Sequence, residues 1–203
     1  MLDWLKNKQH PPYWQKYLSL FENEDKKVGE EKRFVIFDTE TTGLDVQNDV
    51  VLSIGAVGII GDSIVVKDYL EIYIEQEKFD AVGVTVHGIL RNGKETKISE
   101  EEAMTLFLDY IGNATLVGHH VHFDVAMVNE ILERLDLGKL KNETFDTDLM
   151  YQKWKNIMKD TVITLDELCD IFKVSKSHRH TAAGDSFIIA LIFLKLKARL
   201  GLK

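Results

Sequence analysis

The sequence predicts an α/β fold in which helices cover the faces of a mixed sheet, and three patterns support this. Residues 34–37 are four consecutive apolar residues, which is typical of a strand buried on both faces. Two β-rich runs, 50–60 and 63–74, are joined by Gly61-Asp62, a two-residue connection that favours a hairpin. After these three strands, amphipathic segments alternate with short apolar runs, so helices and strands are expected to alternate.

Capping residues and apolar spacing predict the later elements. Ser99 with Glu102 is a capping box that starts a helix reaching about Ile111, and Thr164 with Glu167 is a second one. We expect further strands at 115–117 and ending near 145–147. We expect helices over 123–135, from the end of that last strand to about 158, and from near 181 onwards. The segment 79–95 is expected to be irregular.

Residues 1–32 are expected to be an N-terminal extension, separate from a main domain over residues 33–203. Pro11-Pro12 should break any helix there, although a short helix could form over 15–23. Residues 22–32 are charged and have no apolar period, which indicates a linker.

Composition limits the class of protein. The 203 residues suit one domain, and 45% of them are apolar, which is enough for a core. The single cysteine, Cys169, excludes an internal disulfide and is expected to be a small core residue. We find neither a signal peptide nor a run of membrane-spanning length, so a cytoplasmic location without a membrane partner is expected. The net charge of −8 argues against a protein that coats nucleic acid by charge alone.

Two acids end the first strand. Asp38 and Glu40 are two residues apart, so on an extended backbone they point to the same side. Neighbouring carboxylates repel, and a divalent cation would remove the repulsion because hard cations bind carboxylate oxygens. Thr41-Thr42-Gly43 would then end the strand and let the backbone pass close to whatever the metal holds. The alternative is a solvated turn with two surface acids.

The stretch 38–44 is the motif D-T-E-T-T-G-L, and three other motifs occur later in the chain. They are G-H-H-V-H-F-D at 118–124, H-x-A-x-x-D at 180–185 and the softer V-H-G-I at 86–89. Together, in their order along the chain, these motifs resemble those of the DEDDh 3′–5′ exonucleases, the family that includes the proofreading epsilon subunit of bacterial DNA polymerase III. The resemblance runs from about residue 33 to 196, and it implies a ribonuclease-H-like fold with five strands.

The resemblance implies a site for two Mg²⁺ or Mn²⁺ ions, with Asp38 bridging both. The implied ligands are Asp38, Glu40, Asp124 and Asp185. Ligation by oxygen alone favours these ions over zinc, and two of them can activate a water and support the leaving 3′-oxygen. His180 would be the general base, since an imidazole titrates near neutral pH. All five positions are expected to be catalytic, which argues against a non-catalytic adaptor built on the same fold.

The resemblance also implies contacts with the substrate. The implied positions are Thr41, Leu44, His87, His120 and Phe123. Leu44 and Phe123 would stack on or wedge the last bases, although both could be core residues instead. His120 stands where the family usually has asparagine, which leaves the contact there in doubt. His119, His120 and His122 could form a separate zinc site, but no cysteine accompanies them. Asp146 matches a family aspartate that we interpret as structural.

The implied substrate is DNA with a single-stranded or frayed 3′ end, in replication proofreading or repair. Thr41-Thr42 favours DNA over the alternative, an RNA-trimming exonuclease. The basic run 173–180 could guide the strand or be a solvated loop. Partners could include a DNA polymerase subunit or a sliding clamp, because residues 17–21 (Y-L-S-L-F) are similar to the Q-L-[S/D]-L-F clamp peptide. The alternative is a helix whose apolar face, with Trp14 and Phe21, packs on the domain.

Overall fold

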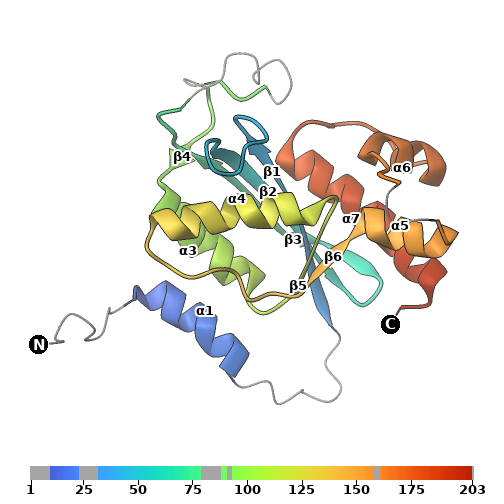
Figure 1. Cartoon of the computed structure of the whole chain (residues 1–203), viewed down its shortest axis with the longest axis horizontal. Coiled ribbons are helices and arrows are strands. Elements are labelled where there is room, and N and C mark those ends of the chain that lie inside the picture. The colour runs from blue at the N-terminus through green and yellow to red at the C-terminus, as the bar shows by residue number, and fades with distance from the viewer. Residues whose placement is uncertain (1–9, 23–31, 79–87, 91–92, 158–160, 203) are drawn as a thin grey trace, which may run out of the picture.

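The computed structural model describes residues 10–22, 32–78, 88–90, 93–157 and 161–202. Its centre is a six-stranded sheet in the order β4-β3-β2-β1-β5-β6 (Figure 1). The strands are β1 (Arg33–Thr41), β2 (Val51–Ile60), β3 (Ser63–Ile74), β4 (Lys97–Ile98), β5 (Thr115–Gly118) and β6 (Thr144–Asp146). The first three pair antiparallel in sequence order, whereas β5 runs parallel to β1, and β6 parallel to β5. The predicted mixed sheet is confirmed.

The expected number of strands, five, is wrong because of β4. This strand has two residues, Lys97 and Ile98, which pair in parallel with Tyr73 and Ile74 of β3. Two residues cannot show the alternation by which a strand is recognised in a sequence. β4 therefore extends the edge of the sheet without changing its centre.

The helices also follow the predicted order. They are α1 (Pro12–Glu22), α3 (Glu100–Ile111), α4 (Val121–Arg134), α5 (Thr147–Lys155), α6 (Leu165–Phe172) and α7 (Ala182–Leu200). Both capping boxes form, at Ser99 and at Thr164. Within the residues described, none of the helices combines the length and the apolar character that crossing a bilayer requires.

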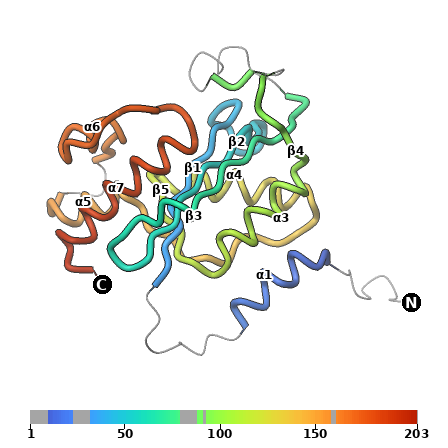
Figure 2. Tube along the Cα trace, turned by 180° about the vertical axis from the view of Figure 1, so that it is seen from behind, coloured from blue at the N-terminus to red at the C-terminus, as the bar shows by residue number. Residues whose placement is uncertain are grey.

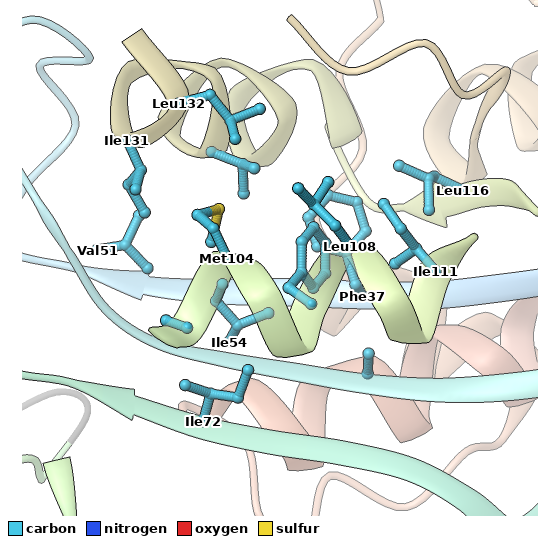
Figure 3. Close-up of a cluster of buried hydrophobic side chains, with 14 of the residues drawn as sticks. Phe37, Val51, Ile54, Ile72, Met104, Leu108, Ile111, Leu116, Ile131 and Leu132 are labelled. Carbon is cyan, nitrogen blue, oxygen red and sulfur yellow. The ribbon is translucent and has the colours of Figure 1, made fainter. Parts of the chain in front are cut away.

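The sheet separates two cores, and alternate residues of β1 belong to each. Val35 and Phe37 lie in a core shared with α1, α3 and α4, whereas Phe34 and Ile36 lie in a core shared with α5, α6 and α7. The helices accordingly form a layer on each side of the sheet (Figures 1 and 2). In the first core, Phe37 lies between the sheet and α3 (Figure 3). Because both faces of β1 are covered, the polar side chains that follow its apolar residues lie at its carboxyl end.

Helix α1 packs against the first core. Trp14 and Tyr17 are only 2% and 1% exposed, and the Tyr17 hydroxyl donates to Asn142 Oδ1 (2.6 Å) and accepts from the Lys141 main-chain nitrogen (2.7 Å). The short helix expected over 15–23 forms, but it begins three residues earlier, at Pro12, so this proline starts the helix instead of breaking it. Proline suits the first helical position because the amide there needs no partner within the helix. The division of the chain at residue 32 stays a prediction.

The similarity of residues 17–21 to a clamp peptide does not extend to conformation. A clamp peptide is extended and exposed, whereas these residues are helical and Tyr17 is buried. Leu18 and Phe21 pack against the first core, and Leu20 is 38% exposed. The structure therefore supports the alternative, an apolar helix face that packs on the domain.

Candidate active site at the end of strand β1

Three acids from two elements meet where β1 ends. Asp38 and Glu40 are on β1, and Asp185 is in the first turn of α7. One carboxylate oxygen of each lies within 4.8 Å of the others. The cluster is at the edge where the parallel strands end, which is where α/β sheets commonly place their sites. The three side chains offer the oxygen ligands that hard divalent cations prefer.

Burial and like charge perturb these acids strongly. Burial is the main cause that raises the pKa of Asp38 well above its usual range, and the charges of Asp124, Asp185 and Glu40 add to it. Burial and the Asp185 charge raise the pKa of Glu40 to about 7. Protons therefore stabilise the metal-free cluster at neutral pH, and a cation would replace them.

Asp124 reaches β1 from the other face of the sheet. It lies in the first turn of α4 and is 4% exposed. Its Oδ1 accepts hydrogen bonds from the Thr39 main-chain nitrogen (3.0 Å) and from Thr39 Oγ1 (2.6 Å). Burial raises the pKa of Asp124 to about 7 although these hydrogen bonds lower it. Asp124 is not within the 4.8 Å group, but its charge acts on Asp38.

Asp185 is balanced by an arginine that the sequence analysis missed as part of the site. Arg179 Nη1 forms an ion pair with Asp185 Oδ2, and Arg179 Nε donates to Asp166 Oδ1 on α6 (3.0 Å). The other oxygen, Asp185 Oδ1, is buried and has no hydrogen-bond partner among the described residues. This free oxygen fits a cation ligand. The only signal in the sequence is the position of Arg179 beside His180.

Two cations of the basic run are paired with acids. Arg179 is paired with two acids, and Lys176 Nζ lies 2.8 Å from Asp170 Oδ1. His180 is exposed and has a left-handed backbone (φ 64°), and its main-chain nitrogen donates to Asp185 Oδ2 (3.3 Å). The loop therefore holds His180 at the border of the cluster.

The implied substrate positions differ in their surroundings. Leu44, just after β1, is 83% exposed, so its side chain is available for contact with a base. Thr41 Oγ1 donates to the Gly43 carbonyl (2.7 Å) and shapes the turn. Phe123 is half-buried and packs against the first core, as the core alternative expects. His87 lies outside the described residues.

His119, His120 and His122 belong to no group of three metal ligands among the described residues. His120 is exposed and left-handed (φ 58°), and its main-chain nitrogen donates to Asp146 Oδ1 (3.2 Å). Asp146 Oδ2 accepts from the Val121 nitrogen (3.0 Å), so Asp146 holds the turn into α4, which fits a structural aspartate. Burial lowers the pKa of His119 to about 4, and its ring lies against His120 with centroids 4.4 Å apart.

The sequence is similar to proteins of bacterial replication. A family model for exonucleases, RNase_T, matches residues 35–193. The DNA polymerase III subunit epsilon of Buchnera aphidicola is 34% identical over 172 residues, which cover 80% of this chain and 72% of that protein. The PolC-type DNA polymerase III of Caldanaerobacter subterraneus is 34% identical over 175 residues, which cover 84% of this chain but 12% of that protein.

Solved structures of exonucleases share the fold. Exonuclease X in complex with 5′ overhanging duplex DNA aligns with a TM-score of 0.65 at 20% identity, over 84% of this chain and 94% of that one. Escherichia coli exonuclease I in complex with a dA16 oligonucleotide aligns with a TM-score of 0.70 at 15% identity, over 84% of this chain and 42% of that one. The predicted ribonuclease-H-like fold is confirmed. The family match, over most of a chain whose acids meet at the end of β1, shows that this protein belongs to the RNase_T exonuclease family and is a nuclease of the epsilon type.

Proposed function

We propose that the protein is a metal-dependent 3′–5′ exonuclease that hydrolyses phosphodiester bonds from single-stranded or frayed 3′ ends of DNA. The observation that carries this is the cluster of Asp38, Glu40 and Asp185, in which the buried Asp185 Oδ1 has no hydrogen-bond partner in the part of the chain that the structure describes. Asp38, Glu40, Asp124 and Asp185 would hold two Mg²⁺ or Mn²⁺ ions. Such ions activate a water and stabilise the leaving 3′-oxygen.

The chain's own residues would supply the rest of the mechanism. His180 takes the proton of the attacking water, for which an exposed imidazole at the border of the cluster is suited. Thr39 keeps Asp124 against β1 through two hydrogen bonds. The exposed Leu44 contacts the last base, because an apolar side chain packs on any base without selecting its sequence.

DNA is the preferred substrate class because Thr41-Thr42 resembles the proofreading branch and because relatives at 34% identity are named as DNA polymerase III proteins. A role in proofreading or repair, beside a DNA polymerase subunit, is the biological setting that these relatives favour. RNA trimming on the same fold is the competing substrate.

A digestion panel tests the proposal. Single-stranded DNA, mismatched duplex, matched duplex and RNA are each labelled at the 5′ end and incubated with Mg²⁺ or Mn²⁺. We expect a ladder of shortening 5′-labelled DNA, whereas degradation from the 5′ end would release the label at once. EDTA and the Asp38→Asn variant, which removes one ligand charge, should both stop digestion. Faster digestion of RNA than of DNA would reassign the substrate, and no digestion of any strand would overturn the proposed function.

A further inference from the structure

We propose that Gly55 is a positioning residue for Asp185, an inference that rests on the proposed function. In the antiparallel pairing of β1 with β2, Gly55 lies directly opposite Asp38. Paired residues in an antiparallel sheet present their side chains to the same face. Gly55 therefore stands beside the acidic cluster, on the side of the sheet that α7 covers.

The first turn of α7 occupies the space where a side chain of residue 55 would be. A Cβ at this position would lie well under 3.0 Å from the main-chain carbon of Ala182 and the main-chain nitrogen of Ala183. Main-chain atoms cannot rotate away, so the helix itself would have to move. At Gly58 on the same strand, the nearest atoms to an added Cβ all belong to the Asp68 side chain, which could turn aside by giving up its ion pair with Arg33.

The displaced turn carries a ligand. Ala182 and Ala183 are the first residues of α7, and Asp185 follows them within the same turn. Thr181 caps this turn, since its Oγ1 accepts from the Gly184 nitrogen (3.1 Å) and donates to the His178 carbonyl (3.0 Å). A shift of the turn moves the Asp185 carboxylate away from Asp38 and Glu40, and a metal site tolerates only small changes in ligand position.

Mn²⁺ binding to the full chain without substrate tests the proposal. We compare wild type, Gly55→Ala and the matched control Gly58→Ala by calorimetry and by the electron paramagnetic resonance of free Mn²⁺, together with thermal unfolding in EDTA. Gly55→Ala should lose about 10- to 100-fold in Mn²⁺ affinity, the usual effect of disturbing the support of a metal ligand. Gly58→Ala should keep the wild-type affinity whatever its melting temperature. A folded Gly55→Ala protein with wild-type affinity would overturn the proposal.

A second variant covers the case in which Gly55→Ala does not fold. Thr181→Ala adds no atoms and removes the cap and the hydrogen bond to the His178 carbonyl. Loss of a cap costs about 1 kcal/mol, so the variant should fold. It should lose several-fold in Mn²⁺ affinity, and Thr181→Ser should restore it; an unchanged affinity in Thr181→Ala would overturn the proposal. Wild type that binds no Mn²⁺ would remove the proposed function as well. If wild type binds Mn²⁺ and digests DNA, and Gly55→Ala binds Mn²⁺ with the same affinity, only this inference is overturned and the proposed function is not.

Discussion

Asp124 and Asp185 occupy equivalent places on opposite faces of the sheet, and the chain treats them differently. Each is buried in the first turn of a helix, α4 or α7. Asp124 accepts two hydrogen bonds from the neutral donors of Thr39, whereas Asp185 faces the guanidinium of Arg179 and keeps one oxygen free. Neutral donors fix the position of a carboxylate and leave its charge uncompensated. An arginine balances the charge but competes with a cation for the same oxygens.

The largest expected effect comes from removing either carboxylate. Asp124→Ala and Asp185→Ala should each abolish digestion of single-stranded DNA in Mg²⁺, since both are proposed ligands. Wild-type-like digestion by Asp124→Ala would contradict the site assignment.

The isosteric variants should separate the two acids in the absence of metal. In EDTA at pH 8, Asp124→Asn should raise the free energy of unfolding, because it removes an uncompensated buried charge and can still accept from Thr39. Asp185→Asn should lower it by about 1–3 kcal/mol, because Arg179 loses an ionic partner. Urea unfolding measures the free energy of unfolding of both variants. Changes of the same sign would show that the ion pair with Arg179 does not make the two acids differ.

His180→Ala should lose on the order of 10²–10⁴ in rate, the usual contribution of a general base. Its Mn²⁺ affinity should change little, because the main-chain nitrogen that bonds to Asp185 remains. His178→Ala is the matched control, since His178 is also exposed and left-handed in the same loop. Single-turnover digestion at neutral pH compares them, and a full rate for His180→Ala would exclude it as the base.

Arg179→Gln should bind Mn²⁺ several-fold more tightly than wild type, because Asp185 is then no longer neutralised. Lys176→Gln is the control, since Lys176 pairs with Asp170, outside the acidic cluster. Calorimetry in the absence of DNA measures both affinities. Weaker binding by Arg179→Gln would mean that Arg179 serves mainly to place Asp185.

The smallest effect should be a dependence of stability on pH in the metal-free protein. Glu40 and Asp124 each have a pKa raised to about 7, above their values in an unfolded chain. Their stabilising contribution is therefore complete below about pH 4 and is lost as the pH rises through 7. In EDTA the melting temperature should fall by several degrees between pH 5 and pH 8. Saturating Mg²⁺ should remove this slope, and an equal slope with and without Mg²⁺ would contradict the assignment.

Local signals in the sequence predict the sheet and the two acids at the end of β1, whereas Asp124 and Asp185 are assigned to the same site by the family resemblance. Four apolar residues followed by Asp38 and Glu40 define β1 and its end, and capping residues mark the helices. The role of Arg179 could not be predicted, because Arg179 lies in the loop before α7, Asp166 lies on α6, and a sequence does not say which charges meet. The same applies to α1: the spacing of its apolar residues is visible, but the surface that covers Trp14 and Tyr17 comes from distant segments.

The docking of α1 has a consequence for the order in which the protein folds. Tyr17 forms hydrogen bonds with Lys141 and Asn142, which follow it in the chain by 124 and 125 positions. At about 5–20 residues per second, a ribosome needs roughly 6–25 s to make that stretch. The apolar face with Trp14 and Tyr17 therefore leaves the ribosome long before its binding surface exists. During that time it is a target for chaperones or for aggregation, and it cannot complete its contacts until residue 142 has been made.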